Sequence, residues 1–240
     1  MSASEKELKE LNATKDKFIS ILAHDLKNPF NSLFGFSELL LKNYKEYDDN
    51  EIEYQLKLIY QASKTTYEHL EQVLLWAKSQ SGKLTIKPEK FSFVKVTHDL
   101  INEFKNQTNQ KNIKINLSES EKISVTADIN MIKTVMRNLI TNAIKFNHEN
   151  GQINISAEIN AQNVIVTVSD NGTGIDKTII PTLWEIKENH TTPGTNDEPG
   201  TGFGLKLCKE LIDKHHGKIW VESEVGKGSD FKFSLPLYYK

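Results

Sequence analysis

The sequence predicts an α+β fold, in which an N-terminal antiparallel helical hairpin precedes an α/β sandwich domain. Residues 5–80 contain one proline and one glycine and repeat apolar side chains at helical spacing, whereas short alternating runs typical of strands follow Gly82. A chain of 240 residues is also long enough for two modest domains. We therefore expect domains at residues 1–82 and 83–240.

The N-terminal domain is predicted to consist of two long helices. Apolar residues in each recur three, four or seven positions apart and form one stripe along the helix. The polar turn Tyr47–Asn50 separates the helices and supplies an N-cap, which favours a hairpin. A lone hairpin leaves its stripes half exposed, so we expect a homodimer in which residues 5–80 of two chains form a four-helix bundle.

The second domain is predicted to be a sheet covered by helices. The expected strands are 113–117, 123–126, 153–159, 164–168, 218–222 and 231–235, and the expected helices are 93–107, 130–146 and 203–215. Residues 176–199 combine Thr, Asn, Pro and Gly with weak periodicity. They are predicted to form a long mobile loop, which in a compact domain is usually a functional lid or disordered.

The composition excludes several partners. With 30 Lys+Arg against 32 Asp+Glu, no broad field attracts nucleic acid or a membrane surface. The single Cys208 fits a reducing, cytoplasmic setting and is interpreted as a small buried residue rather than a redox sensor. No apolar run approaches the roughly 20 residues that span a bilayer, so we expect a soluble chain. This expectation is compatible with a membrane anchor elsewhere in a longer gene product.

The run NLITNAIKFN places Asn138, Asn142 and Lys145 on one stripe of a predicted helix. Asparagine is a poor helix former, so its presence there suggests a function. The amide oxygens can bind Mg²⁺, and the lysine ammonium can meet phosphate oxygens. A solvated helix face with incidental asparagines explains the run equally well when it is taken alone.

Asp170 ends a predicted strand and opens the run DNGTGI. Its carboxylate can accept a hydrogen bond from an exocyclic amine such as that of adenine, and Gly172 and Gly174 would let the backbone approach a flat ligand. A turn that requires positive φ is a strong alternative explanation for the same glycines.

The run GTGFGL, residues 200–205, precedes an apolar helix whose N-terminus could bind phosphates. The run alone is weak evidence for a nucleotide. It differs from the dinucleotide fingerprint because no strand precedes it, and from the P-loop because no Gly-Lys-Ser/Thr follows.

His24 lies in the run AHDLKNP on the first predicted helix. A neutral imidazole is a nucleophile near pH 7, Asp25 is near enough to act as its general base, and Asn28 shares the face of His24. Pro29 removes a backbone hydrogen bond beside this site. An isolated histidine is ordinarily a surface or core residue, which is how we interpret the other six: His69, His98, His148, His190, His215 and His216.

Together, the runs NLITNAIKF, DNGTGI and GTGFGL resemble the N, G1 and G2 boxes of sensor histidine kinases. These enzymes belong to the ATPase superfamily of gyrase, Hsp90 and MutL. FISILAHDLKNPFNSLFGFSELL resembles their H-box, which the other three classes lack.

The resemblance implies ATP and Mg²⁺ as cofactors, with Asn142 holding the metal and Asn138 supporting the metal or the phosphates. It implies that Lys145 neutralises phosphate charge and that Asp170 reads the adenine amine. The ATP-binding residues that it implies are Asn138, Asn142, Lys145, Asp170, Gly172, Gly174, Gly200, Thr201, Gly202, Gly204 and Leu205.

The resemblance further implies autophosphorylation of His24 and transfer of the phosphate to an aspartate of a response-regulator receiver domain. Asn28 occupies the position that orients water for regulator dephosphorylation in related proteins. The predicted lid departs from the family, because only Leu183-Trp184 resembles its aromatic stretch and the usual arginine is absent. A non-catalytic dimeric ATP-binding signalling scaffold is therefore the main alternative, and an ATPase clamp of the gyrase type ranks below it.

Overall fold

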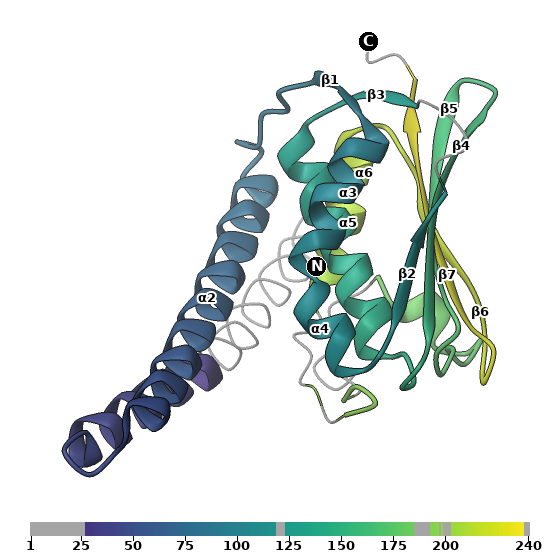
Figure 1. The fold of residues 1–240 in the computed structure, drawn as a ribbon. Helices are drawn as coiled ribbons and strands as arrows, with labels where there is room; N and C mark the ends of the chain where they lie inside the picture. The colour runs from purple at the N-terminus through teal and green to yellow at the C-terminus, as the bar shows by residue number, and fades with distance from the viewer. Residues whose placement is uncertain (1–26, 119–122, 185–192, 197, 199–202, 238–240) are drawn as a thin grey trace, which may run out of the picture. The chain divides into compact units, whose positions relative to one another are not determined.

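The computed structural model describes residues 27–118, 123–184, 193–196, 198 and 203–237. The chain divides into two compact units, Met1–Leu84 and Thr85–Lys240, which we describe separately. The first unit is helical and the second combines a sheet with helices (Figure 1), which confirms the predicted α+β fold.

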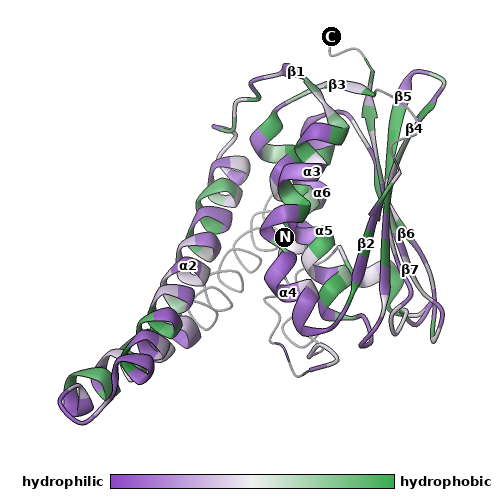
Figure 2. Cartoon of the chain, in the orientation of Figure 1, coloured by the Kyte–Doolittle hydropathy of each residue, from purple (hydrophilic) through white to green (hydrophobic). Residues whose placement is uncertain are grey.

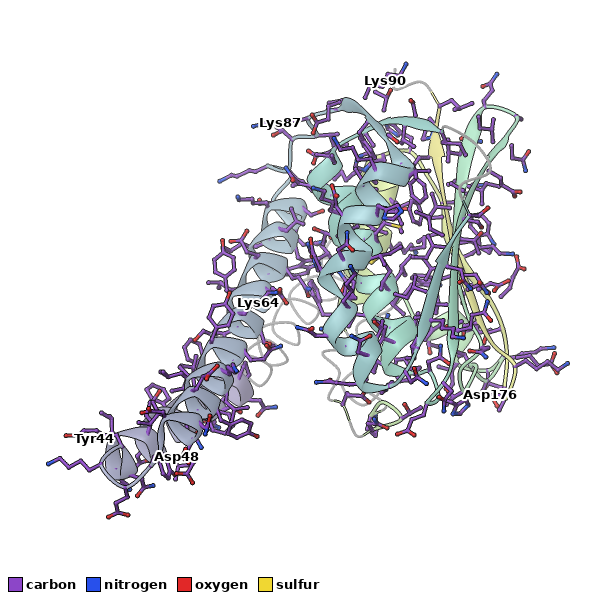
Figure 3. All side chains as sticks on the ribbon, in the orientation of Figure 1. Tyr44, Asp48, Lys64, Lys87, Lys90 and Asp176 are labelled. Atoms are coloured by element: carbon purple, nitrogen blue, oxygen red, sulfur yellow. The ribbon has the colours of Figure 1, made fainter. Side chains whose placement is uncertain are left out.

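The first unit contains a helix over residues 27–43 and the long helix α2, Asp49–Gln80. A capping box begins α2 at the tip of the hairpin, where Figure 3 labels Asp48. The Glu51 backbone N–H donates to Asp48 Oδ1 over 2.8 Å, and the Asp48 backbone N–H donates to Glu51 Oε2 over 2.9 Å. The N-cap expected in this turn is confirmed. At the other end, Gly82 adopts φ +67° and follows the last helical turn.

Large apolar side chains of this hairpin are open to solvent within a single chain. Phe34, Leu41 and Tyr60 are 71%, 76% and 70% exposed. Figure 2 shows that hydrophobic residues recur among polar ones along α2. Burial of a large apolar side chain contributes about 1.5–3 kcal/mol.

The second unit is built on a five-stranded sheet in the order β2-β4-β5-β7-β6. Only β2 and β4 pair in parallel, while the other neighbours are antiparallel. A separate two-stranded antiparallel sheet pairs β1 with β3. The strands are β1 Glu89–Ser92, β2 Lys114–Leu117, β3 Ser124–Ala127, β4 Gln152–Asn160, β5 Asn163–Asp170, β6 Ile219–Glu224 and β7 Gly228–Pro236.

Helices cover one face of the large sheet (Figure 1). They are α3 Phe93–Glu103, α4 Lys105–Gln110, α5 Ile129–Lys145 and α6 Gly204–Lys214. Alternate residues of β5, Val164, Val166 and Val168, are buried under the helices, as strand periodicity requires. Leu139 of α5 and Leu207 of α6 are fully buried, so these two helices form the centre of the core. The predicted helix-covered sheet is confirmed.

Three local features differ from the sequence expectation. The helix expected over residues 93–107 is interrupted at the buried Phe104, whose N–H donates to Ile101 O and closes the first segment. Strand β1 was not predicted, because its sequence EKFS contains a single apolar residue, Phe91, and therefore no alternation. A short 3₁₀ helix, η1, Ile180–Thr182, lies within the predicted loop. Among the described residues, no helix combines the length and apolar character needed to cross a membrane.

Candidate functional site

The start of α5 is tied to the end of α6. Asp128 caps α5 by accepting from the backbone N–H groups of Asn130 and Met131 over 3.1 and 3.2 Å. Its own backbone N–H donates to His215 Nε2 over 3.0 Å, and His215 Nδ1 lies 2.7 Å from Leu211 O. Burial lowers the pKa of His215, so the ring is neutral and donates through Nδ1. The two helices that carry the N and G2 runs are therefore held in a defined relation.

Asn138 and Gly204 bring these two runs together. The Asn138 amide donates to Thr134 O over 2.9 Å, which orients the side chain along α5. Its Oδ1 then lies against Gly204, the first residue of α6, where the Cβ of any other residue would collide with it. Gly204 therefore lets α6 begin directly against the Asn138 side chain.

Asn142 lies one turn further along α5 and is half buried. No hydrogen bond joins its side-chain amide to another residue in the described part of the chain. Its amide oxygen is thus available for a ligand, which is the property that a metal-binding asparagine needs.

Lys145 ends α5 with its side chain buried, since only 9% of the residue is exposed. Its ammonium lies 4.7 Å from the centre of the Phe146 ring. Burial lowers the pKa of Lys145, the Glu198 carboxylate opposes this by raising it, and the nearby Lys111 lowers it again. A cation in such a poorly hydrated position gains from the arrival of an anion such as phosphate.

Asp170 ends β5 and is 8% exposed. Its Oδ1 accepts from the Gly172 backbone N–H over 2.9 Å. Burial raises the pKa of Asp170 to about 6, because the hydrogen bonds from the Gly172 and Ser229 backbones compensate only part of the lost hydration. The carboxylate is ionised at pH 7 and is a strong acceptor for an amine.

The glycines after Asp170 permit contacts between backbones. A Cβ on Gly172 would collide with the carbonyl of Phe146 at the end of α5, where Thr173 N–H also donates to Phe146 O over 3.0 Å. Gly174 has φ +68° and lies against the backbone of Glu224 and Val225. Gly174 is therefore explained by a turn that requires positive φ, which was the alternative to a ligand contact. Both glycines allow the loop after Asp170 to pack closely against neighbouring backbone.

Five of the predicted site residues lie outside the described residues: His24, Asp25, Gly200, Thr201 and Gly202. Asn28 is exposed on the helix over residues 27–43. Leu205 is half buried in the first turn of α6. Cys208 is fully buried as predicted, and burial raises the pKa of its thiol.

Lys111 was not among the predicted site residues, although it is 4% exposed and its ammonium donates hydrogen bonds to the last carbonyls of α5. No local pattern distinguishes it from other lysines, because its partners are more than thirty residues away in the sequence. The helix-capping roles of Asp128 and His215 were also missed, although an aspartate directly before a helical pattern is a recognised N-cap signal.

Comparison with known families agrees with this arrangement. Residues 127–239 match the model of the "Histidine kinase-, DNA gyrase B-, and HSP90-like ATPase" family, and residues 14–82 match that of the "His Kinase A (phospho-acceptor) domain". The first range includes Asn138, Asp170 and Gly204, and the second includes His24.

Individual relatives are also similar. "Adaptive-response sensory kinase SasA" from Synechocystis sp. is 29% identical over 93% of this chain and 60% of its own length. The catalytic domain of histidine kinase ThkA is 31% identical, with a TM-score of 0.55 over 63% of this chain and 96% of that domain. A structure of ThkA in complex with the response regulator protein TrrA is 24% identical, with a TM-score of 0.62 over 98% of this chain and 65% of that one. The chain spans about a quarter to three-fifths of the length of the curated relatives that it matches.

Proposed function

The chain belongs to the sensor histidine kinase family, and on that premise we propose that it uses ATP to phosphorylate His24. The observation that carries this proposal is the presence of both family regions in one chain, one including His24 and the other including the nucleotide-binding runs. We assign residues 1–82 to dimerisation and histidine phosphotransfer and residues 83–240 to ATP binding and catalysis.

In this proposal, Asp170 accepts a hydrogen bond from the adenine amine and Lys145 neutralises phosphate charge. The burial of both groups supports these roles, because a dehydrated charge forms strong interactions with a complementary ligand. The contact of Gly204 with Asn138 supports a phosphate side formed jointly by α5 and the start of α6, to which Gly200, Thr201, Gly202 and Leu205 also belong.

Mg²⁺ fits the amide oxygens of α5. Asn142 would hold the ion through its available side-chain oxygen, and Asn138 Oδ1 would support the ion or the phosphates. When bound, Mg²⁺ offsets negative charge on the phosphates of ATP.

The transfer is an in-line displacement in which the protein mainly supplies positioning. A neutral imidazole nitrogen of His24 forms a bond to the γ-phosphorus, while the bond from this phosphorus to the β–γ bridging oxygen breaks and ADP leaves. The other imidazole nitrogen carries the proton as the phosphorylated ring becomes positively charged, and Asp25, as the general base, stabilises this N–H or takes its proton.

The proposed partners are a second copy of the chain and a response-regulator receiver domain. The exposed apolar side chains of the hairpin support dimerisation through residues 5–80. The complex of ThkA with TrrA supports a regulator as the phosphate acceptor, because that kinase shares this fold. Asn28, exposed on its helix, would orient water for dephosphorylation of the regulator.

Radiolabelled ATP tests the phosphotransfer. With [γ-³²P]ATP and Mg²⁺, the wild-type chain is expected to acquire acid-labile label, and His24→Ala is expected to acquire none while still binding ATP. His98→Ala is the matched control: His98 is an exposed histidine on α3 in the other unit, and its replacement is expected to leave labelling intact. Equal labelling of wild type and His24→Ala would reject the proposal.

A non-catalytic scaffold is the alternative, favoured by the absence from the sequence of the lid arginine that is common in the family. A scaffold binds ATP but acquires no label on His24, whereas a gyrase-type clamp releases phosphate even from the His24→Ala variant. For the regulator, equal decay of its phosphorylated form with wild type and Asn28→Ala would reject the role of Asn28.

A further inference from the structure

Lys111 is a buried lysine whose ammonium contacts several protein oxygens. It follows α4, and its ammonium donates to Ile144 O over 3.2 Å and to Lys145 O over 3.1 Å. It also donates to Thr195 Oγ1 over 2.9 Å and pairs with the Glu198 carboxylate. The first two contacts cap the C-terminus of α5, where a cation is favoured by the helix dipole.

The other two contacts hold a second segment against the same helix end. We call Gly194, Thr195, Asn196 and Glu198 the anchored segment. The Thr195 backbone N–H donates to Lys145 O over 3.0 Å, and its hydroxyl donates to Asn147 O over 2.6 Å. Gly194 lies so close to Lys145 that a Cβ would collide with its side chain and carbonyl. The anchored segment therefore packs directly on the residue that would bind phosphate.

The anchored segment is also closed on itself. Gly194 N–H donates to Glu198 O over 2.9 Å, and Asn196 N–H donates to Glu198 Oε2 over 2.9 Å. Glu198 thus links the turn to Lys111, because Oε2 accepts from the Asn196 N–H while Oε1 pairs with the Lys111 ammonium. Burial raises the pKa of Glu198, but the hydrogen bond to Lys111, the backbone hydrogen bonds within the turn and the charge of Lys111 outweigh it and lower the pKa overall.

The two ends of this ion pair differ in their access to water. The Lys111 side chain is 5% exposed and the Glu198 side chain 34%. The Glu198 carboxylate can replace its contact with Lys111 by a hydrogen bond to water. The Lys111 ammonium is buried and would lose its hydrogen-bond partners without gaining water. Lys111 is therefore the fixed point, and the end of α5 and the anchored segment are both positioned by it.

From this geometry we infer that Lys111 is a positioning residue for the phosphates of the nucleotide. It holds the last turn of α5 and the anchored segment together, so that the side chain of Lys145 is presented in one orientation. The inference rests on the proposed role of Lys145 in binding ATP. Lys111 itself is not expected to contact the nucleotide, because its donors are already used by protein oxygens.

The test compares Lys111→Met, which keeps the length of the side chain and removes its charge, with Lys114→Met as the matched control. Lys114 lies three residues further on and is exposed on β2. Calorimetric titration of the full chain measures the dissociation constants of ATP, ADP and adenosine. Lys111→Met is expected to raise the dissociation constants of ATP and ADP by about tenfold. This is the effect of losing one hydrogen bond to a charged group, here the contact of a misplaced Lys145 with phosphate. Adenosine, which lacks phosphates, is expected to bind as to wild type.

An equal loss of affinity for all three ligands would contradict positioning, since general destabilisation of the domain acts on adenosine as well. Unchanged affinity for ATP would also overturn it. Thr195→Val supplies a milder variant that keeps the shape of the side chain and removes its hydroxyl contacts, in case Lys111→Met does not fold. It is expected to raise the dissociation constants of ATP and ADP but not that of adenosine.

Amide hydrogen exchange separates this inference from the proposed function. In the nucleotide-free chain, Lys111→Met and Thr195→Val are expected to speed exchange at the Thr195 N–H, while Lys114→Met leaves it unchanged. Unchanged exchange in both variants would reject the anchoring role even if ATP binds. A wild-type chain that binds no adenine nucleotide would reject the proposed function, whatever the exchange shows.

Discussion

Asp170→Asn is expected to stabilise the second unit while weakening its affinity for adenine nucleotides. Asp170 is a buried carboxylate whose hydration is only partly replaced by backbone hydrogen bonds. Asparagine has nearly the same shape, and its amide oxygen can still accept from the Gly172 N–H. The substitution therefore removes the cost of burying a charge and retains most of the packing.

The size of the gain follows from the pKa. Burial raises the pKa of Asp170 from 3.8 to about 6. Each pKa unit corresponds to about 1.4 kcal/mol, so the ionised carboxylate destabilises the fold by about 3 kcal/mol at pH 7. The native state binds more protons than the unfolded state between these two values, so this destabilisation develops as the pH rises from about 4 to 6. Below pH 4 the carboxyl is protonated in both states and the cost disappears.

Pulsed amide hydrogen exchange across a urea series measures this effect on the β5 and β7 peptides, which report the second unit separately from the hairpin. At pH 7.5, Asp170→Asn is expected to raise the free energy of unfolding by up to about 3 kcal/mol, and at pH 4 by about zero. Asp213→Asn, an equal change of charge on the exposed face of α6, is the control and is expected to have little effect at either pH.

Nucleotide binding supplies the opposite readout. The variant loses a charge-assisted hydrogen bond to adenine, so the dissociation constant of ADP is expected to rise by about tenfold or more. Wild-type affinity for ADP is expected to fall as the pH drops through 6, because protonation removes the ionised acceptor. An equal gain in stability at pH 4 and pH 7.5 would refute the reasoning, since a packing effect does not depend on the charge of Asp170.

Three further predictions concern single residues of the second unit. Ala161→Gly is expected to raise the free energy of unfolding by about 1 kcal/mol in urea denaturation, because Ala161 has φ +54° between β4 and β5; equal stability would contradict strain there. His215→Gln is expected to reduce the loss of stability below pH 6.5, because burial lowers the pKa of His215 and the unfolded chain therefore takes up its proton more readily than the folded chain; the same assay at pH 5.5 and 7.5 checks this. Cys208 is expected to resist a thiol reagent until urea unfolds the chain, and rapid labelling of the native chain would contradict its burial.

Several elements were predictable because their determinants are local. The turn at Asp48 carries its own capping residues within four positions, and the buried positions of β5 alternate along the chain. The helical pattern before Lys145 likewise marks α5. Capping residues lie next to the helix that they cap, and buried side chains repeat at the period of the helix or strand. In each case the signal can therefore be read from neighbouring residues of the sequence.

Other elements depended on partners distant in the sequence. Four residues become strand β1 only because they pair with β3. Gly172 lies against the backbone at the end of α5, a contact with a residue 26 positions away in the sequence. Nothing in the residues next to either feature specifies which surface it meets.

The sequence by itself determined the class of fold, the positions of most helices and strands, and the runs that identify the family. The tertiary structure alone decided which of those residues meet, as Asn138 meets Gly204, and that Lys111 reaches both Lys145 and Thr195. The physical reason is that periodicity records which face of an element is buried and not what covers it. A lysine whose partners lie 34 and 84 positions away leaves no pattern in the sequence around it.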